Sequence, residues 1–184
     1  RVDSGKIVLR REPFDLGCVI ANAVAIAGGA LDGEPVSLTI VYPDLLPRGF
    51  IGDDERIGQI VRNLVGNAIK FTDNGAITVS VDASRHHADN RTDQAHTVTI
   101  TVSDTGIGIP EDKHEMIFEP FFQADSSSTR RYGGAGLGLS IVKRFVTLMD
   151  GLITVDSTPG KGTAFTVMLP LAVDFNRRPE CGES

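Results

Sequence analysis

The chain has 184 residues, with 24 acidic against 18 basic side chains and a formal net charge of −6. This length suits one domain with a full core, and the negative charge disfavours a nucleic-acid-binding protein, which usually shows a basic patch. No apolar run approaches the ~18 residues of a membrane helix and no signal peptide is recognisable, so we expect a cytoplasmic domain without direct membrane contact. Because it begins at Arg1 rather than Met, we expect a piece of a longer protein, and the sequence leaves open whether that parent is membrane-anchored.

The first half of the chain predicts alternating strands and helices. Asp15 is a candidate N-cap for the first helix, and Asp53 or Asp54 for the second, because a carboxylate accepts hydrogen bonds from the free N–H groups at a helix start. Pro43 and Pro47 mark a loop before the second helix. In chain order, the expected elements are a strand over 6–13, a helix over 16–31, a strand over 36–42 and a helix over 54–70.

The second half predicts a hairpin, a short helix, a longer helix and a final strand pair. Alternating apolar residues put Ile77, Val79 and Val81 on one face of the first hairpin strand, and Val98, Ile100 and Val102 on one face of the second. The polar stretch 85–95 forms the hairpin loop, and "TPGK" forms the turn of the final pair. In chain order, the expected elements are strands over 75–84 and 96–104, helices over 110–116 and 136–151, and strands over 151–157 and 162–171.

This order of elements indicates a fold class. Antiparallel strand pairs outnumber strand–helix–strand alternation, so we expect an α+β fold, an α/β sandwich with helices layered on one face of a mixed, mostly antiparallel sheet. We expect one domain over residues 1–171, followed by a polar tail or linker over 172–184.

The predicted helix "RIGQIVRNLVGNAIKFT" has an apolar face and a polar stripe. At about 100° per residue, Asn63, Asn67 and Lys70 align at positions i, i+4 and i+7. Most such stripes are simply solvated, but asparagine is a mediocre helix former. An amide oxygen can ligate a hard cation and a lysine can meet a phosphate, so both interpretations stay open. The apolar face holds Ile57, Ile60, Val61, Leu64 and Ala68.

The stretch "SDTGIGIP" follows the second hairpin strand and also has two interpretations. It can be a strand-ending turn in which Gly106 and Gly108 take positive φ angles. It can equally present Asp104 at a strand end, beside a thin backbone that admits a flat ligand. The stretch alone does not choose between them.

Two further stretches suggest a phosphate site. "YGGAGLGLS" is not a Walker A loop, because Leu139 stands where the lysine must be, and it is not a dinucleotide fingerprint. It is either a hinge or a glycine run that opens a helix, whose free N–H groups favour phosphate. Before it, "IFEPFFQADSSSTRRYGG" puts aromatic residues ahead of a polar stretch with Arg130 and Arg131. That combination suggests a lid whose cations swing toward a triphosphate.

In this order, the four stretches resemble the ATP-binding catalytic domain of sensor histidine kinases, in the superfamily that includes gyrase, HSP90 and MutL. "NLVGNAIKFT", "DTGIGIP", "FEPFFQAD" and "GGAGLGLS" are similar to its N, G1, F and G2 boxes, and "TPGKGTAF" to its final glycine box. The resemblance covers roughly residues 4–171. It implies three helices over a mixed five-stranded sheet, with ATP bound between the helices and the lid.

The resemblance implies ATP and Mg²⁺ as cofactors and assigns roles to individual residues. Asp104 would accept a hydrogen bond from the exocyclic amine of adenine with support from Thr163, and Asn67 would coordinate Mg²⁺. Arg130 or Arg131 would meet the γ-phosphate. The other residues implied in nucleotide binding are Asn63 and Lys70 at the phosphates, Phe71, Gly106, Gly108 and Ile109 at the adenine, Phe118 in the F box, and Gly134, Gly136, Leu137 and Gly138 through backbone N–H groups.

The resemblance further implies phosphoryl transfer to a histidine on a dimerisation domain of the same protein, with a response regulator downstream. We expect that acceptor to be missing here, since none of the four histidines sits in a His-Glu/Asp pair on an amphipathic helix. A slow self-sufficient ATPase is one alternative, because Asn63 stands where hydrolysing members place a glutamate base. A regulatory module that binds nucleotide without transferring phosphate is another.

Overall fold

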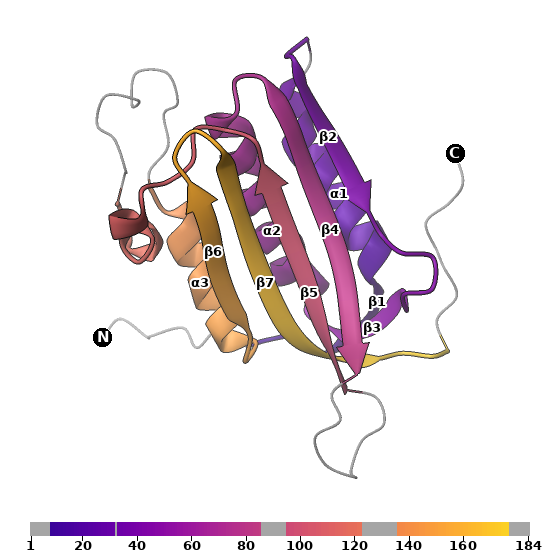
Figure 1. The fold of residues 1–184 in the computed structure, drawn as a ribbon. Coiled ribbons are helices and arrows are strands. Elements are labelled where there is room, and N and C mark those ends of the chain that lie inside the picture. Colours follow the sequence, from indigo (N-terminus) through magenta and orange to yellow (C-terminus); the bar gives the residue numbers. More distant parts are fainter. Residues whose placement is uncertain (1–7, 32, 86–94, 123–135, 177–184) are drawn as a thin grey trace.

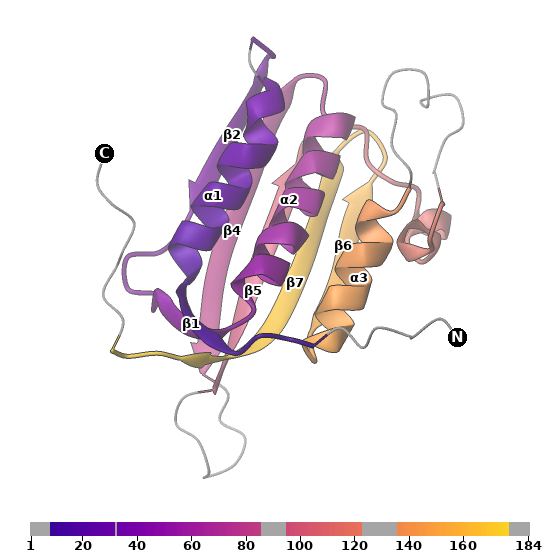
Figure 2. The same cartoon turned by 180° about the vertical axis from the view of Figure 1, so that it is seen from behind.

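Three helices lie side by side on one face of a single mixed sheet (Figure 1, Figure 2), in a computed structural model that describes residues 8–31, 33–85, 95–122 and 136–176. This arrangement confirms the predicted α+β class. The helices are α1 (Leu16–Gly28), α2 (Asp54–Phe71) and α3 (Gly138–Leu148), with 3₁₀ turns η1 (Gly29–Leu31), η2 (Glu111–Lys113) and η3 (Met116–Phe118). The strands are β1 (Glu12–Asp15), β2 (Val36–Val41), β3 (Gly49–Gly52), β4 (Gly75–Arg85), β5 (Ala95–Asp104), β6 (Leu152–Thr158) and β7 (Gly162–Val173).

The sheet runs in the order β1-β3-β7-β5-β4-β2, and β6 also pairs with β7. Only β2 and β4 are parallel among these pairs; the others are antiparallel. The described residues thus form seven strands, where the sequence pattern predicted six and the resemblance implied a sheet of five. β3 was missed because it has four residues, two of them glycine, which is too short for an alternating pattern to show. It forms because β1 and β7 flank it on both sides.

The last strand, β7, extends beyond the predicted domain end at residue 171. Ala172 and Val173 pair with Ile51 and Phe50 of β3, and Val173 is buried. The sheet therefore continues two residues past residue 171, and the domain boundary itself stays a prediction. Pairing with a strand that the sequence did not reveal decides where the sheet ends.

The core lies between the helices and the face of the sheet that they cover. The alternating residues predicted for the hairpin, from Ile77 to Val81 on β4 and from Val98 to Val102 on β5, are all at most 3% exposed. The apolar face of α2 packs onto them and is equally buried. Since α2 also lies between α1 and α3 (Figure 2), burial of this one face fixes the position of its polar stripe.

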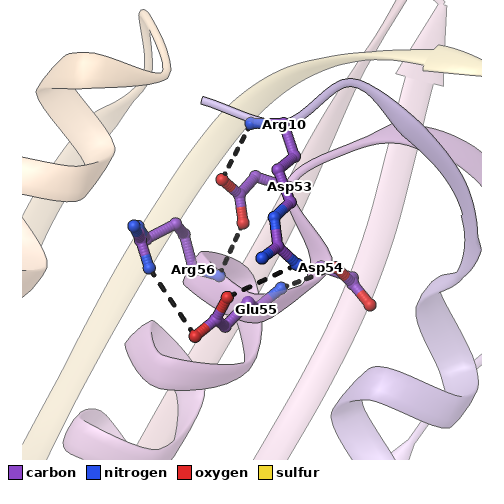
Figure 3. A network of polar contacts seen from close by, with 5 residues as sticks. All are labelled: Arg10, Asp53, Asp54, Glu55 and Arg56. Carbon is purple, nitrogen blue, oxygen red and sulfur yellow. Dashed lines mark hydrogen bonds and ion pairs between the residues drawn. The ribbon is translucent and has the colours of Figure 1, made fainter. Parts of the chain in front are cut away.

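Asp53 fixes the start of α2 (Figure 3). Its carboxylate is 2% exposed; Oδ1 accepts the N–H of Arg56 at 3.0 Å and Oδ2 accepts the N–H of Arg10 at 3.0 Å. Glu55 adds exposed ion pairs to Arg10 at 3.6 Å and to Arg56 at 3.9 Å. Asp53 is thus the N-cap rather than Asp54, and it also ties the segment before β1 to α2.

Two predicted helices differ from those observed. Residues 110–116 form no α-helix; η2 and η3 replace it, and neither has a side-chain cap to extend it. The helix expected over 136–151 begins at Gly138 and ends at Leu148, where Asp150 adopts a φ of 55° and the N–H of Gly151 bonds the carbonyl of Val146 at 2.8 Å. Within the described ranges, no helix is long and apolar enough to cross a membrane.

Candidate functional site

The polar stripe of α2 remains accessible after the apolar face is buried. Asn63, Asn67 and Lys70 are all half-buried. The Asn63 amide donates to the backbone carbonyl of Gly138 at 3.4 Å, and the Lys70 ammonium lies 5.1 Å from the centre of the Phe71 ring. Among the described residues, no hydrogen bond uses the Asn67 amide. Within this stripe, Asn63 therefore contacts the start of α3, while the Asn67 amide and the Lys70 ammonium can reach a ligand.

Asp104 ends β5 and is held by the backbone around it. Its Oδ1 accepts the N–H of Gly106 at 2.8 Å, which orients the carboxylate at the start of the loop 105–110. Burial raises the pKa of the Asp104 carboxyl above its ordinary value, while backbone hydrogen bonds from Gly106 and Thr163 lower the pKa by less. An oriented, partly desolvated carboxylate of this kind is suited to accept a hydrogen bond from one ligand donor.

The two glycines of this loop are required by contacts inside the protein. A Cβ at Gly106 would overlap the backbone carbonyl of Phe71, at the end of α2. Gly108 adopts a φ of 71°, and a Cβ there would overlap the backbone carbonyl of Thr158, at the end of β6. Contacts within the protein are thus sufficient to require glycine at both positions, and the predicted contact of the base with this loop stays a prediction. The loop is a turn and a candidate site at once.

A hydroxyl cluster holds the far side of the loop. The Ser157 hydroxyl accepts the N–H of Ile109 at 2.8 Å, lies 2.9 Å from the Thr163 hydroxyl and donates to the carbonyl of Gly162 at 2.9 Å. Thr163 supports Asp104 through its backbone, opposite Asp104 in the β5–β7 register, whereas its hydroxyl contacts Ser157. Thr163 is buried, so its side chain serves the packing of the loop.

The start of α3 has backbone N–H groups without a hydrogen-bond partner inside the helix. The first helical hydrogen bond runs from the N–H of Ile141 to the carbonyl of Leu137 at 3.0 Å, so the N–H groups of the preceding turn have no partner within the helix. Leu137 offers no side-chain cap, and the Ser140 hydroxyl donates to the Leu137 carbonyl instead of accepting. Gly138, the first helical residue, is half-buried. Such a helix start favours an anion.

Two phenylalanines of the F box differ in burial: Phe118 is buried and Phe121 is exposed. Phe118 is 9% exposed and meets Phe165 edge-on with ring centres 6.2 Å apart, so it lies in the core, and its role in nucleotide binding stays a prediction. Phe121 is exposed, with a φ of 63°, and its N–H bonds the carbonyl of Gly136 at 3.1 Å. Gly136 itself adopts a φ of 66° against Phe121. The predicted site residues Arg130, Arg131 and Gly134 lie outside the described residues.

One helix joins these parts. The N–H of Ile107 bonds the carbonyl of Phe71 at 3.2 Å, which attaches the loop after Asp104 to the end of α2. Asn63, eight residues earlier, attaches the same helix to the start of α3. At 1.5 Å per residue the two attachment points are about 12 Å apart. The Asn67 and Lys70 side chains project between them.

This arrangement is that of a known family. The family model described as histidine kinase-, DNA gyrase B-, and HSP90-like ATPase matches residues 52–173. The chain belongs to this family. It is an ATP-binding domain of the sensor histidine kinase type, as the resemblance of the sequence motifs indicated.

Relatives of the domain are sensor kinases. It is 37% identical over 176 residues to the signal transduction histidine-protein kinase BarA of Escherichia coli, and 40% identical over 172 residues to the sensor protein GacS of Pseudomonas syringae. These alignments cover 96% and 93% of this chain but only 19% and 18% of the relatives. The chain therefore spans about a fifth of the length of the relatives it matches.

Solved structures share the fold. Full-length ShkA in complex with AMPPNP superimposes with a TM-score of 0.76 at 30% identity, covering 91% of this chain and 32% of that one. The mycobacterial sensor histidine kinase MprB superimposes with a TM-score of 0.66 at 27% identity, covering 89% of this chain and 99% of that one.

Two residues of this ATP-binding domain were not singled out from the sequence. Ser157 bonds the loop from β6, and the His114 Nε2–H donates to the carbonyl of Ile109 at 3.0 Å. Ile109 is thereby held at both of its backbone polar groups. Neither residue belongs to a spaced motif with Asp104, so only their position in the fold reveals the contact. The one available signal was that a serine precedes the "TPGK" turn.

Proposed function

We propose that this domain catalyses phosphoryl transfer from ATP to a histidine on a separate helical domain of the same protein. The observation that carries the proposal is the double attachment of α2. Its end holds the loop of Asp104, and its Asn63 holds the uncapped start of α3. A carboxylate for a base and N–H groups that have no partner inside α3 thus flank the stripe of Asn67 and Lys70.

The base would be recognised at Asp104. Its carboxylate accepts hydrogen bonds only, so it suits the exocyclic amine of adenine and repels the carbonyl oxygen that guanine carries at that position. Ile109 and Phe71, both half-buried beside the loop, would supply apolar contact to the ring. Asp104 would therefore select adenine over guanine.

The phosphates would lie along the stripe and the start of α3. Lys70 supplies a cation and the first turn of α3 supplies backbone N–H groups. The Asn67 amide, half-buried and without a partner among the described residues, fits Mg²⁺, which usually takes one or two protein oxygens and completes its shell with water and phosphate. Bound there, Mg²⁺ would neutralise phosphate charge. Either Arg130 or Arg131 would add a cation at the γ-phosphate.

The transfer step needs a residue from another domain. The unprotonated ring nitrogen of the acceptor histidine attacks the γ-phosphorus, the bond from that phosphorus to the bridging oxygen breaks, and ADP leaves. The proton on the other ring nitrogen is then released, and phosphohistidine remains. This domain contributes orientation of ATP and stabilisation of charge. A response regulator would take the phosphoryl group next.

The structure bears on the alternative of an ATPase. Asn63, at the position where hydrolysing members have a glutamate, uses its amide to bond the start of α3. An amide is no general base, so activation of water by this residue is not expected and hydrolysis should be slow. A module that binds nucleotide without transfer keeps every contact described above, and only activity separates it from a kinase.

Radiolabelled ATP tests the proposal. The full-length protein should become labelled on histidine, and the 184-residue domain should label a separately supplied dimerisation domain. Asn67→Ala should reduce labelling by on the order of 100-fold and adenine nucleotide binding far less, since the amide acts at the phosphates. Nucleotide binding without any labelling would favour the module without transfer. Normal labelling by Asn67→Ala would remove the Mg²⁺ role.

A further inference from the structure

The loop 105–110 is held between α2 and the β6–β7 turn. Two of the bonds join backbone to backbone. The carbonyl of Ile107 accepts the N–H of Gly160 at 2.8 Å, and the N–H of Ile107 donates to the carbonyl of Phe71 at 3.2 Å. Such bonds form with almost any side chains in place. The third, from the N–H of Ile109 to the Ser157 hydroxyl, depends on one side chain.

The hydrogen-bond roles at Ser157 follow from its single hydroxyl proton. The carbonyl of Gly162 can only accept, so Ser157 donates its proton there. The Thr163 hydroxyl at 2.9 Å must then donate to Ser157, as does the N–H of Ile109. One oxygen donates once and accepts twice, and alanine at this position would leave three partly buried groups without their partner.

These partners lie on both sides of Asp104. Ile109 belongs to the loop that follows Asp104, and Thr163 stands opposite Asp104 in the β5–β7 register. Gly162 also lies against Asp104. It adopts a φ of 110°, and a Cβ at this position would overlap the backbone carbonyl of Asp104. The backbone of Thr163 also lowers the pKa of the Asp104 carboxyl. Ser157 thus ties the loop after Asp104 to the strand opposite it.

We propose that Ser157 is a positioning residue for base recognition, acting through Asp104 and Ile109 rather than by touching the nucleotide. Its hydroxyl sets the distance between the loop and β7, and hence the direction in which the Asp104 carboxylate faces the base. The inference rests on the proposed function, in which Asp104 reads the exocyclic amine of adenine.

A purely structural role is the alternative, and the same sheet supplies a matched control. The hydroxyls of Thr101 and Thr166 lie 3.2 Å apart between β5 and β7, several residues from the loop. Thr101→Val removes one hydroxyl contact between β5 and β7 of the same sheet, so it reports what the loss of such a contact costs in thermal stability. It should leave nucleotide affinity unchanged if position relative to Asp104 is what matters.

The experiment is a calorimetric titration of the 184-residue domain with AMPPNP and Mg²⁺. Ser157→Ala should raise the Kd about five- to tenfold, the factor expected for one or two lost hydrogen bonds, while Thr101→Val stays within about twofold of wild type. Wild-type affinity in Ser157→Ala, or an equal loss in both variants, would overturn the proposal. If Ser157→Ala does not fold, Thr163→Val takes its place in the test, because it removes only the hydroxyl that donates to Ser157.

A double-mutant cycle shows whether the effect passes through Asp104. In an Asp104→Asn background, Ser157→Ala should change the Kd by less than about twofold, because the recognition it supports is already lost. A full effect in that background would mean that Ser157 acts independently of Asp104, against the proposal. If Asp104→Asn itself binds AMPPNP as wild type does, the base assignment under the proposed function fails. If Asp104→Asn is weak and Ser157→Ala is normal, only this inference fails.

Discussion

The two ends of α2 are held in different ways. At its start, Asp53 uses both carboxylate oxygens on backbone N–H groups, one inside the helix and one from Arg10. At its end, the carbonyl of Phe71 receives a bond from Ile107 and touches Gly106, where no side chain fits. The start of α2 thus depends on the Asp53 side chain, whereas its end depends on the absence of a side chain at Gly106.

This difference separates stability from binding. The contact at the start ties α2 to the segment before β1, at the opposite end of the helix from the loop of Asp104. The contact at the end sets the loop that carries the candidate base contact. Changes at the start should therefore act on the free energy of unfolding, and changes at the end on nucleotide affinity. The following substitutions test that division.

Gly106→Ala should have the largest effect. The added methyl group would overlap the Phe71 carbonyl, which belongs to the backbone and cannot rotate away. We expect a loss of about 3 kcal/mol in the free energy of unfolding, with no measurable nucleotide binding. Denaturant titration and calorimetry measure the two quantities.

Gly66→Ala on α2 is the matched control. A Cβ at Gly66 meets no atom within 4 Å, so alanine should raise the free energy of unfolding by about 0.5–1 kcal/mol through helix propensity. Equal behaviour of the two variants would contradict the importance of the contact between Gly106 and Phe71.

Asp104→Asn should weaken ATP binding by on the order of 10- to 100-fold, the range for a hydrogen bond to a charged group. The same substitution should raise the melting temperature of the unliganded domain at neutral pH, because burial disfavours the charged carboxylate. A variant that binds ATP normally would disprove the assignment of the base contact. Calorimetry and thermal melts give both readouts.

The pH dependence sharpens the prediction for Asp104. Its pKa is raised in the folded domain, so the folded state binds the proton more tightly than the unfolded state does. Lowering the pH from neutral through the raised pKa should stabilise wild type relative to Asp104→Asn. The gap in melting temperature between the two should narrow over that range, and a gap that widens would contradict the raised pKa.

Asp53→Ser should have a moderate effect on stability alone. A serine hydroxyl can still cap the N–H of Arg56, but it cannot also reach the N–H of Arg10 with a second oxygen. We expect a loss of about 1 kcal/mol in the free energy of unfolding and little change in nucleotide Kd. Asp53→Ala, which loses both bonds, should lose more. A large change in nucleotide Kd with either variant would contradict the assignment of stability to the start of α2 and of nucleotide affinity to its end.

Arg10→Ala should have the smallest effect. It removes the ion pair with Glu55, in which both side chains are more than half exposed, and it keeps the backbone N–H that bonds Asp53. We expect a change in the free energy of unfolding of at most about 0.5 kcal/mol. Melts at low and high salt check this, and a larger loss would show that the side chain matters as well as the backbone.

Local pattern alone predicted much of this domain. The apolar period of α2, the alternation in β4 and β5, and the caps Asp15 and Asp53 are properties of neighbouring residues, and each is confirmed. The motif order indicated the family for the same reason, since every motif is a short continuous stretch. These features depend on helix and strand geometry that any few residues already express.

Tertiary structure decided the rest, because it rests on contacts between residues far apart in the chain. Gly106 and Gly108 are glycines because Phe71 and Thr158 approach them, and Phe118 is buried because Phe165 meets it. β3 exists because β1 and β7 flank it. Ser157 looks like an ordinary residue before a turn until the sheet places its hydroxyl against Ile109. Sequence spacing carries no record of such approaches, whereas the packed sheet and helices define them.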